Sequence, residues 1–189
     1  FAHERGVVHR DLKPSNIMLG EYGEVHLLDW GIAQVKGIEE HVTAALDLSR
    51  EHLHETQAGF VIGTPGYLAP EQARGERETY GGRSDIYSLG CILFEVMTLN
   101  SLHPLENVNE SLMSTVQGSA DARPSVRAVE RRLPLQLDEI CGRATALNPA
   151  QRYSSARAMN EAIEALLDGD RDMARRGELA DKHLATARE

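Results

Sequence analysis

Several features that would place a chain in a large class of proteins are absent from these 189 residues. There are only two cysteines, Cys91 and Cys141, and no Cys-x-x-Cys spacing, which argues against a disulfide scaffold and a cysteine-rich metal site. The most apolar run, Ile86–Met97, is too short to span a bilayer. Because 29 acidic residues outnumber 20 basic ones, no basic face for a nucleic acid is expected. We therefore expect no nucleic-acid partner and no membrane contact by this segment.

The residues that are present have an ordinary globular composition. Hydrophobic residues make up 41% and charged residues 26%, and the length suffices for one buried core. Both cysteines have apolar neighbours and are expected to be buried free thiols, which suits a cytoplasmic protein. The chain starts at Phe1 and not at a methionine. We interpret it as a piece of a longer parent chain, which could itself be membrane-anchored.

The first third of the chain predicts short strands separated by polar loops. Residues 1–8 are expected to end a helix. The apolar stretches Ile17–Leu19 and Val25–Leu28 surround a glycine-containing turn and predict a hairpin. Residues 32–62 are mostly polar and predict one long loop.

From Ser84 onward the spacing of apolar residues predicts helices. Ser84–Thr98 is apolar on nearly all sides, so we expect a helix buried through its length, with Ser84 as its N-cap. Three further helices are expected at Leu105–Val116, Leu137–Leu147 and Ala156–Leu167, the last of them ended by Gly169. Two strands followed by a helical bundle predict an α-rich α+β fold.

The octet HRDLKPSN, His9–Asn16, contains the groups that phosphoryl transfer to a hydroxyl requires. Such a transfer needs a carboxylate that orients the hydroxyl, oxygen ligands for Mg²⁺ and a cation near the moving phosphoryl group. Asp11 is the candidate carboxylate, Lys13 the cation, and Asn16 and Asp29 the ligands. The predicted hairpin would return the chain so that both ligands meet one metal ion. The alternative for Asp11 and Asn16 is a polar turn between a helix and a strand.

The octet and the DWG at Asp29–Gly31 closely resemble the catalytic loop and metal-binding segment of eukaryotic-like Ser/Thr protein kinases. The resemblance is closest to bacterial members. It continues in three segments: GTPGYLAPEQA at Gly63–Ala73, SDIYSLGCILFEVMT at Ser84–Thr98 and NPAQRYSSA at Asn148–Ala156. It implies that residues 1–167 are the C-terminal, large lobe of a kinase domain, mainly helical with a short hairpin at the catalytic loop. Residues 168–189 are expected to form a charged helical extension or a linker.

The same resemblance implies structural roles for three matched residues. Glu71 should form a largely buried ion pair with Arg152 and tie the activation segment to the helical base. Asp85 should hold the backbone of the catalytic loop. The alternatives are two unrelated surface charges for the pair, and a carboxylate favoured by the helix dipole for Asp85.

A substrate-binding role is implied for the segment that begins at Gly63. Thr64 resembles the threonine that touches the catalytic aspartate and lysine, here Asp11 and Lys13, and favours Ser/Thr over Tyr substrates. Gly66 and Tyr67 complete the expected substrate platform.

Arg10 resembles the arginine that binds a phosphorylated activation loop, so we expect phosphorylation of that loop. Thr56 is the first candidate site, followed by Ser49 and Thr43.

The sequence departs from the family pattern in two places within this lobe. Trp30 replaces the usual phenylalanine beside His9, and both are expected to pack in the hydrophobic spine. The stretch Glu39–Gln57 looks like an insertion. A metal site is one interpretation of its histidines, His41, His52 and His54, but no cysteine or paired-carboxylate frame accompanies them, so we expect a solvated loop.

The glycine-rich turn, strand lysine and helix glutamate that clamp ATP in this family are absent from the sequence. We expect ATP and Mg²⁺ (or Mn²⁺) as cofactors, with an N-terminal lobe of the parent chain as a necessary partner. The isolated piece is expected to bind nucleotide weakly and to turn over poorly. Protein substrates and a homodimer for trans-autophosphorylation are the other expected partners.

Two other functions are compatible with this sequence. The chain could be a pseudokinase or truncated scaffold that binds protein partners without catalysis. The second is a small-molecule phosphotransferase, which the expected substrate platform at Gly63–Ala73 disfavours.

Overall fold

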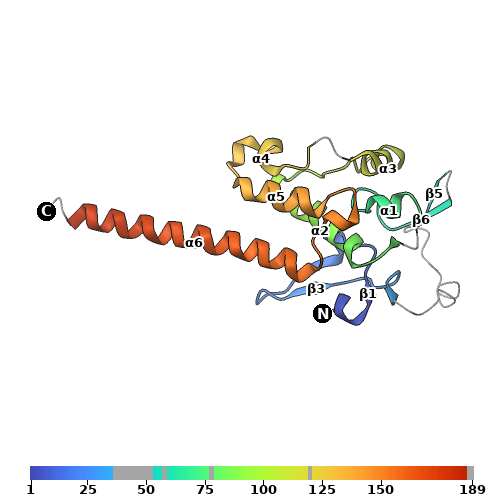
Figure 1. The fold of residues 1–189 in the computed structure, drawn as a ribbon, viewed down its shortest axis with the longest axis horizontal. Coiled ribbons are helices and arrows are strands. Elements are labelled where there is room, and N and C mark those ends of the chain that lie inside the picture. The colour runs from blue at the N-terminus through green and yellow to red at the C-terminus, as the bar shows by residue number, and fades with distance from the viewer. Residues whose placement is uncertain (36–52, 57–58, 77–78, 119–120, 187–189) are drawn as a thin grey trace.

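The computed structural model describes residues 1–35, 53–56, 59–76, 79–118 and 121–186. About half of the chain is helical, and the described strands form three two-stranded antiparallel sheets. The helices build the body of the domain around α2, and the long helix α6 projects from it (Figure 1). The predicted α-rich α+β class is therefore confirmed.

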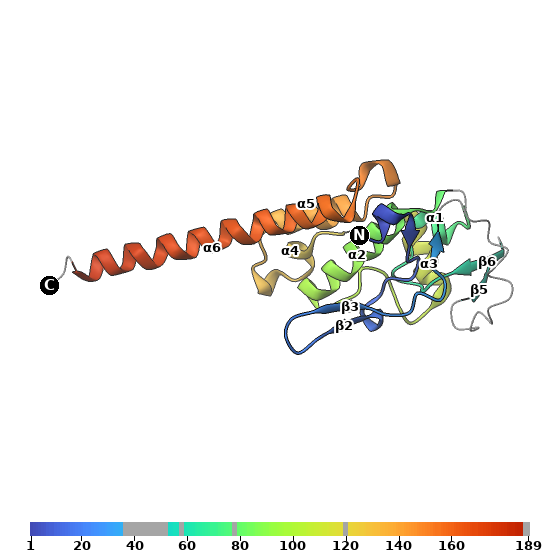
Figure 2. The same cartoon turned by 90° about the horizontal axis from the view of Figure 1, so that it is seen from below.

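The hairpin predicted around the glycine-containing turn is present. Strand β2 (Ile17–Leu19) pairs with β3 (Val25–Leu27), so that Ile17 faces Leu27 and Leu19 faces Val25. Figure 2 shows this hairpin along the lower side of the domain. The turn uses Gly23 at a φ of 89°, a left-handed conformation that favours glycine.

The prediction that residues 1–8 end a helix is wrong. A single 3₁₀ turn at His3–Arg5 is ended by Gly6 at a φ of 74°, and β1 (Val7–Val8) follows. Strand β1 pairs with β4 (Gln34–Val35), a partner distant in sequence that local periodicity could not indicate.

The prediction of a single loop over residues 32–62 is also wrong for the described part of this stretch. Besides β4, this stretch holds β5 (Leu53–Thr56) and β6 (Gly59–Ile62), which pair as an antiparallel hairpin. The polar composition predicted a loop because it indicates that no face of the segment is buried. Composition does not indicate whether the segment pairs with another strand.

Helix α2 (Gly82–Thr98) is the central element of the core. The buried residues Tyr87, Cys91 and Phe94 pack with Tyr67 and Leu102 in one cluster. Cys91 and Cys141 are buried free thiols, as expected. Burial raises the pKa of both thiols, to about 12 for Cys141, so both stay protonated and unreactive at neutral pH.

Two expectations for α2 need correction. The N-cap is Gly81, and Ser84 lies one turn inside the helix, where its hydroxyl accepts a 3.3 Å hydrogen bond from the Gly81 amide. The helix is not buried throughout, because Val96 is 57% exposed on the face that borders a groove described below.

The remaining helices surround α2. They are α1 (Pro70–Ala73), α3 (Val108–Gln117), α4 (Pro124–Arg127), α5 (Leu135–Ala144) and α6 (Ala156–Thr186). Helix α3 begins three residues later than predicted because Asn107 caps it, accepting a 2.9 Å hydrogen bond from the Asn109 amide. Gly169 does not end α6: it lies inside the helix, where glycine costs about 1 kcal/mol without breaking it.

None of the described helices is long and apolar enough to cross a membrane.

Candidate active site

Asp85 of α2 holds the loop after β1 that carries Asp11. Its carboxylate accepts hydrogen bonds from the backbone amides of His9 (2.8 Å) and Arg10 (2.9 Å), and from His3 Nε2 (2.7 Å). Arg10 has a φ of 72°, which is strained for a side chain of this size. A hydrogen bond from Gln72 Nε2 to the Arg10 carbonyl (2.9 Å) adds a further restraint. The contact expected of Asp85 is thus present.

Asp11 lies at the centre of a closed set of contacts and is only 3% exposed. The amide of Thr64 donates to its Oδ1 at 2.9 Å, and Lys13 Nζ lies 3.1 Å from its Oδ2. The same ammonium donates to Thr64 Oγ1 at 2.8 Å. Asn16 Nδ2 donates to the Asp11 carbonyl at 2.9 Å. The structure therefore brings these four predicted residues together.

Asn16 and Asp29 lie at the two ends of the β2–β3 hairpin. A 3₁₀ turn at Pro14–Asn16 leads into β2, and the Leu28 amide donates to the Asn16 carbonyl at 2.8 Å. The hairpin thus returns the chain to the level of Asn16 immediately before Asp29, as the sequence argument required. Asp29 is exposed at a φ of 56°, and its Oδ1 accepts a 3.3 Å hydrogen bond from the Gly31 amide.

Trp30 and His9 are in direct contact. Their ring centroids are 4.7 Å apart at an interplanar angle of 52°. The indole donates to the Leu27 carbonyl at 3.1 Å, and His9 Nε2 lies 3.0 Å from the Leu28 carbonyl. Trp30 and His9 therefore pack against each other, and Trp30 remains 40% exposed.

The structure contains the ion pair expected between Glu71 and Arg152. Arg152 donates from Nη1 and Nη2 to the two carboxylate oxygens of Glu71, each at 2.8 Å, and both residues are 2% exposed. Ser84 donates to the same carboxylate, and the Arg152 guanidinium lies over the ring of Tyr87. Burial alone would raise the pKa of Glu71, but the hydrogen bonds and charge of Arg152 outweigh it and lower that pKa.

The substrate platform expected at Thr64, Gly66 and Tyr67 forms a tight turn beside Asp11. Gly63 and Gly66 have φ values of 118° and 95°, which favour glycine. The Tyr67 hydroxyl donates to Glu95 Oε2 at 2.6 Å. Sequence reasoning missed the contact between Tyr67 and Glu95, because the two residues lie 28 positions apart in the chain.

The expected phosphorylation sites lie largely outside the described residues. Thr43 and Ser49 are not described, and Thr56 is described only as a backbone position in β5. His41 and His52 are also outside, and the side chain of His54 is not described. Among the described residues, no group of three or more His, Cys, Asp or Glu could hold a metal ion.

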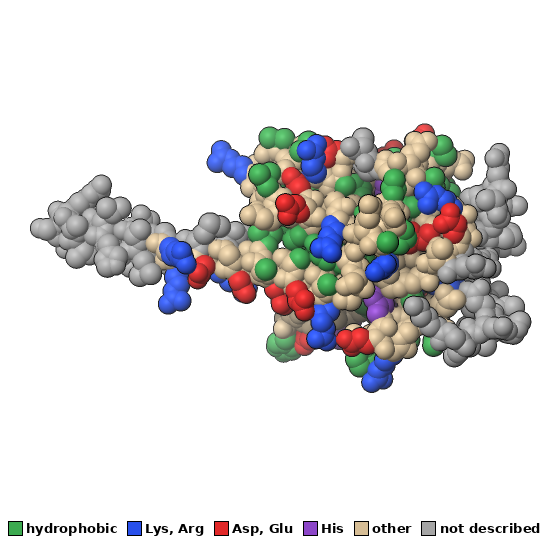
Figure 3. Space-filling view, viewed as in Figure 1, with side chains coloured by type: hydrophobic (Ala, Val, Ile, Leu, Met, Phe, Trp, Pro, Cys, Tyr) green, Lys and Arg blue, Asp and Glu red, His purple; other side chains and the backbone are tan. Residues whose placement is uncertain are grey.

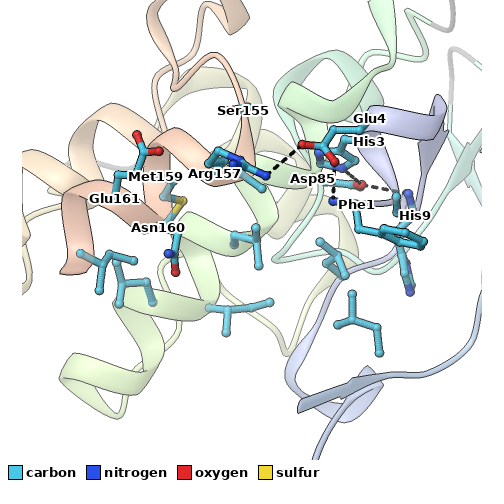
Figure 4. A pocket seen from close by; sticks show the side chains of 18 of the residues that line it. Phe1, His3, Glu4, His9, Asp85, Ser155, Arg157, Met159, Asn160 and Glu161 are labelled. Atoms are coloured by element: carbon cyan, nitrogen blue, oxygen red, sulfur yellow. Dashed lines mark hydrogen bonds and ion pairs between the residues drawn. The ribbon is translucent and has the colours of Figure 1, made fainter. Parts of the chain in front are cut away.

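An open groove of about 1080 Å³ lies next to this site (Figure 4). Arg157 of α6 reaches Glu4 across it at 3.3 Å. Figure 3 shows hydrophobic side chains gathered beside the part of α6 that packs on the domain. The apolar lining consists mainly of Leu12, Leu27, Leu89, Ile92, Leu93, Val96, Met159 and Ile163. His9, Trp30 and Asp85 also border the groove, whereas Asp11 and Asp29 do not.

The buried carboxylate of Asp11 is thus held by Lys13 and Thr64, and Asn16 and Asp29 lie at the two ends of the hairpin that follows. The protein kinase domain family matches residues 1–163, and the chain belongs to this family. It is 37% identical over 172 residues to the serine/threonine-protein kinase PknD of Chlamydia abortus and 36% identical to that of Chlamydia felis. Its identity to PknD of Protochlamydia amoebophila is 37%. Each alignment covers 89% of this chain but only 17 or 18% of the relative, so the chain spans less than a fifth of their length.

Proposed function

We propose that this chain is the catalytic and substrate-binding lobe of a kinase that transfers the γ-phosphoryl group of ATP to Ser and Thr hydroxyls of proteins. The observation that carries the proposal is the position of Asp11. Its carboxylate is buried and aligned by the Thr64 amide and the Lys13 ammonium. A carboxylate held in this way can orient an incoming hydroxyl and accept its proton.

Lys13 and Thr64 act with Asp11 in this proposal. Lys13 supplies positive charge beside the oxygen that attacks, which stabilises the negative charge that develops during transfer. The 2.8 Å hydrogen bond from Lys13 to Thr64 Oγ1 holds that charge beside Asp11. Thr64, Gly66 and Tyr67 then form the surface on which the peptide lies.

Asn16 and Asp29 would hold Mg²⁺ together with the phosphates of ATP. Asn16 uses its Nδ2 on Asp11, which leaves its amide oxygen as a ligand, and Asp29 offers an exposed carboxylate. This small set of oxygen donors fits Mg²⁺, which usually binds one or two protein groups plus substrate phosphates and water. When bound, Mg²⁺–ATP supplies the phosphoryl group and neutralises the charge of its phosphates.

We propose that the N-terminal lobe of the parent chain covers the surface beside this site. The β2–β3 hairpin exposes apolar side chains, with exposed fractions of 74% for Leu19 and 62% for Val25. Exposed apolar side chains that adjoin one another on a soluble domain usually mark an interface. Since the ATP clamp is absent from this chain, we expect the isolated 189 residues to turn over poorly.

Two further residues are assigned to regulation. Arg10 is proposed to bind a phosphate on the activation segment, with Thr56 as the first candidate. Peptide mass spectrometry of active parent kinase should find a phosphate between residues 32 and 64. Only unmodified peptides from this stretch would reject the assignment.

Phosphate transfer by the full parent chain tests the proposed function. We expect wild type to transfer radiolabelled phosphate from ATP to a generic protein, and Asp11→Asn to abolish the transfer without lowering the melting temperature. A wild-type parent chain that folds, binds protein partners and transfers no phosphate would establish a scaffold instead. Equal activity of Asp11→Asn and wild type would also reject the mechanism.

A further inference from the structure

His103 bridges two helices through its two ring nitrogens. It lies in the loop after α2 and is only 1% exposed. Its Nε2 lies 2.7 Å from the hydroxyl of Tyr87 on α2, and its Nδ1 lies 2.8 Å from the hydroxyl of Ser114 on α3. Each hydroxyl can donate or accept a hydrogen bond, so a neutral imidazole satisfies both of them in either tautomer. His103 therefore joins α2 to α3 by two hydrogen bonds.

The central residue of the substrate platform packs against the α2 end of this bridge. Tyr67 lies in the same core cluster as Tyr87. Its carbonyl oxygen accepts a 2.7 Å hydrogen bond from Ser88 Oγ of α2, and its hydroxyl donates to Glu95 of the same helix at 2.6 Å. The position of Tyr67 is therefore set by α2.

The two neighbours of this tyrosine in the chain pack against α3 instead. Leu68 clusters with Leu112 of α3, and both side chains are buried. Gly66 leaves no room for a side chain, because an added Cβ atom would overlap Leu105 and lie 3.8 Å from Ser111 Oγ of α3. The platform thus spans the junction of α2 and α3, and its shape depends on how these two helices are placed relative to each other.

The bridge is costly to lose because its α2 end is buried. Tyr87 is 1% exposed, so its hydroxyl is shielded from water when the imidazole is removed. A buried hydroxyl without a partner costs free energy, which the helices recover by shifting until another group or a water molecule reaches it. Such a shift moves α3 relative to α2 and distorts the platform between them.

From these contacts we infer that His103 is a positioning residue for protein substrates: it fixes α3 against α2 and thereby sets the shape of the platform at Gly66–Leu68. It acts through these helices and not by contact with the reacting atoms. The candidate catalytic group is held by other contacts, because Thr64 and Lys13 bind Asp11. His103 should therefore affect the binding of protein substrates more than the transfer step. The inference rests on the proposed function and adds a residue outside the site that controls its substrate surface.

Steady-state kinetics of the full parent kinase with a generic protein substrate test this inference. His103→Leu removes both hydrogen bonds, so we expect KM for the protein to rise about tenfold, while kcat and KM for ATP change less than about twofold. His103→Gln should keep KM near the wild-type value, because its amide can still bond to both hydroxyls. Ser114→Ala removes only the bond to α3 and should raise KM for the protein about fivefold.

Gln117→Ala is the matched control for Ser114→Ala, because Gln117 is an exposed polar residue in the last turn of α3. It should leave all of these kinetic constants unchanged. Melting temperatures identify a variant that fails to fold. If His103→Leu fails in this way, Ser114→Ala supplies the test, because Ser114 is the half-buried end of the bridge.

A KM for the protein that stays at the wild-type value in Ser114→Ala would overturn the inference while leaving phosphoryl transfer intact. Equal changes in kcat and in KM for ATP would also overturn it, because they would indicate a general loss of structure. A KM as high in His103→Gln as in His103→Leu would contradict the hydrogen-bonded bridge. Absence of phosphate transfer by wild type would reject the proposed function, and this inference with it.

Discussion

The ammonium group of Lys13 donates a hydrogen bond of 2.8 Å to Oγ1 of Thr64, a residue 51 positions further along the chain. The same ammonium lies 3.1 Å from Asp11, and the Thr64 amide donates to the other oxygen of that carboxylate. These contacts close a ring of three residues. The ring joins the catalytic loop to the substrate platform at the point where transfer is proposed.

Replacing Thr64 tests this ring. Thr64→Val keeps the shape of the side chain and removes only the hydroxyl that Lys13 binds, so we expect kcat to fall roughly ten- to a hundredfold, as for one hydrogen bond to a charged group. Thr64→Ser keeps the hydroxyl and should retain most of the activity. Steady-state kinetics of the parent kinase measure both variants. If valine and serine gave the same kcat, the hydroxyl would have no part in the reaction.

The buried ion pair of Glu71 and Arg152 should contribute strongly to the free energy of unfolding. Glu71→Gln leaves the Arg152 guanidinium buried without its counter-ion, so we expect the free energy of unfolding to fall by about 3–5 kcal/mol. Urea unfolding measures the loss. Replacing both partners by Leu and Met should recover part of it, because no buried charge then remains unpaired.

An exposed ion pair provides the control for this prediction. Arg171 and Asp168 on α6 are 3.2 Å apart but 78% and 74% exposed, so Arg171→Ala should leave the unfolding curve unchanged. A loss in Glu71→Gln no larger than that in Arg171→Ala would contradict the role assigned to the buried pair.

His103 should make stability depend on pH. Its ring nitrogens lie 2.7 Å from the Tyr87 hydroxyl and 2.8 Å from the Ser114 hydroxyl. Burial and then the charge of Arg127 lower its pKa to about 4, from an ordinary value near 6.5. Between these values the unfolded chain binds a proton that the folded chain does not. This contribution is therefore complete above pH 6.5 and is lost as the pH falls towards 4, by about 3 kcal/mol in all.

Unfolding by urea between about pH 4 and pH 7.5 measures this dependence. His103→Gln can still hydrogen-bond to Tyr87 and Ser114 but does not titrate, so its stability should change less over the same range. Parallel pH profiles of wild type and His103→Gln would show that other groups cause the acid sensitivity.

Glycine substitutions distinguish backbone strain from helix propensity. At Gly63, with a φ of 118°, a Cβ atom would come within 3.1 Å of the Arg10 carbonyl and still closer to the Leu68 side chain. Gly63→Ala should therefore destabilise the domain by at least about 1 kcal/mol and impair the adjacent catalytic loop.

Gly142→Ala is the matched control, because Gly142 lies inside α5 with no atom near the added Cβ. It should stabilise the domain by about 0.5–1 kcal/mol. Thermal unfolding compares the two variants. Similar melting temperatures would show that the left-handed conformation at Gly63 is not required.

Local chemistry explains which parts of the fold and the site could be predicted. The octet around Asp11 and the hairpin after it were predictable, because neighbouring residues in sequence carry both the turn signals and the functional groups. The core position of α2 followed from its nearly continuous apolar surface. Family membership followed from the order and spacing of the motifs, and the match of the protein kinase domain family to residues 1–163 confirms it.

Two of the wrong predictions concern features that depend on distant partners, and a third concerns a glycine inside a helix. Strand β1 forms because Val7 pairs with Val35, and this pairing converted an expected helix end into a strand. Ser84 was expected to cap α2, but it lies inside the helix and binds Glu71. Helix α6 continues through Gly169, because glycine ends a helix only where the chain turns into a left-handed conformation.

The sequence by itself determined the inventory of chemical groups and their local geometry: an aspartate, a lysine and an asparagine on one loop, and a second aspartate at the end of a hairpin. The family resemblance implied the contacts of Thr64 and Asp85, and the tertiary structure supplied their geometry. Only the tertiary structure brought Tyr67 to Glu95 and Val7 to Val35. The physical reason is range. Turn signals and motif spacing involve residues that are close in sequence. These contacts join segments that are far apart in sequence and meet only when the apolar faces of the helices pack around α2.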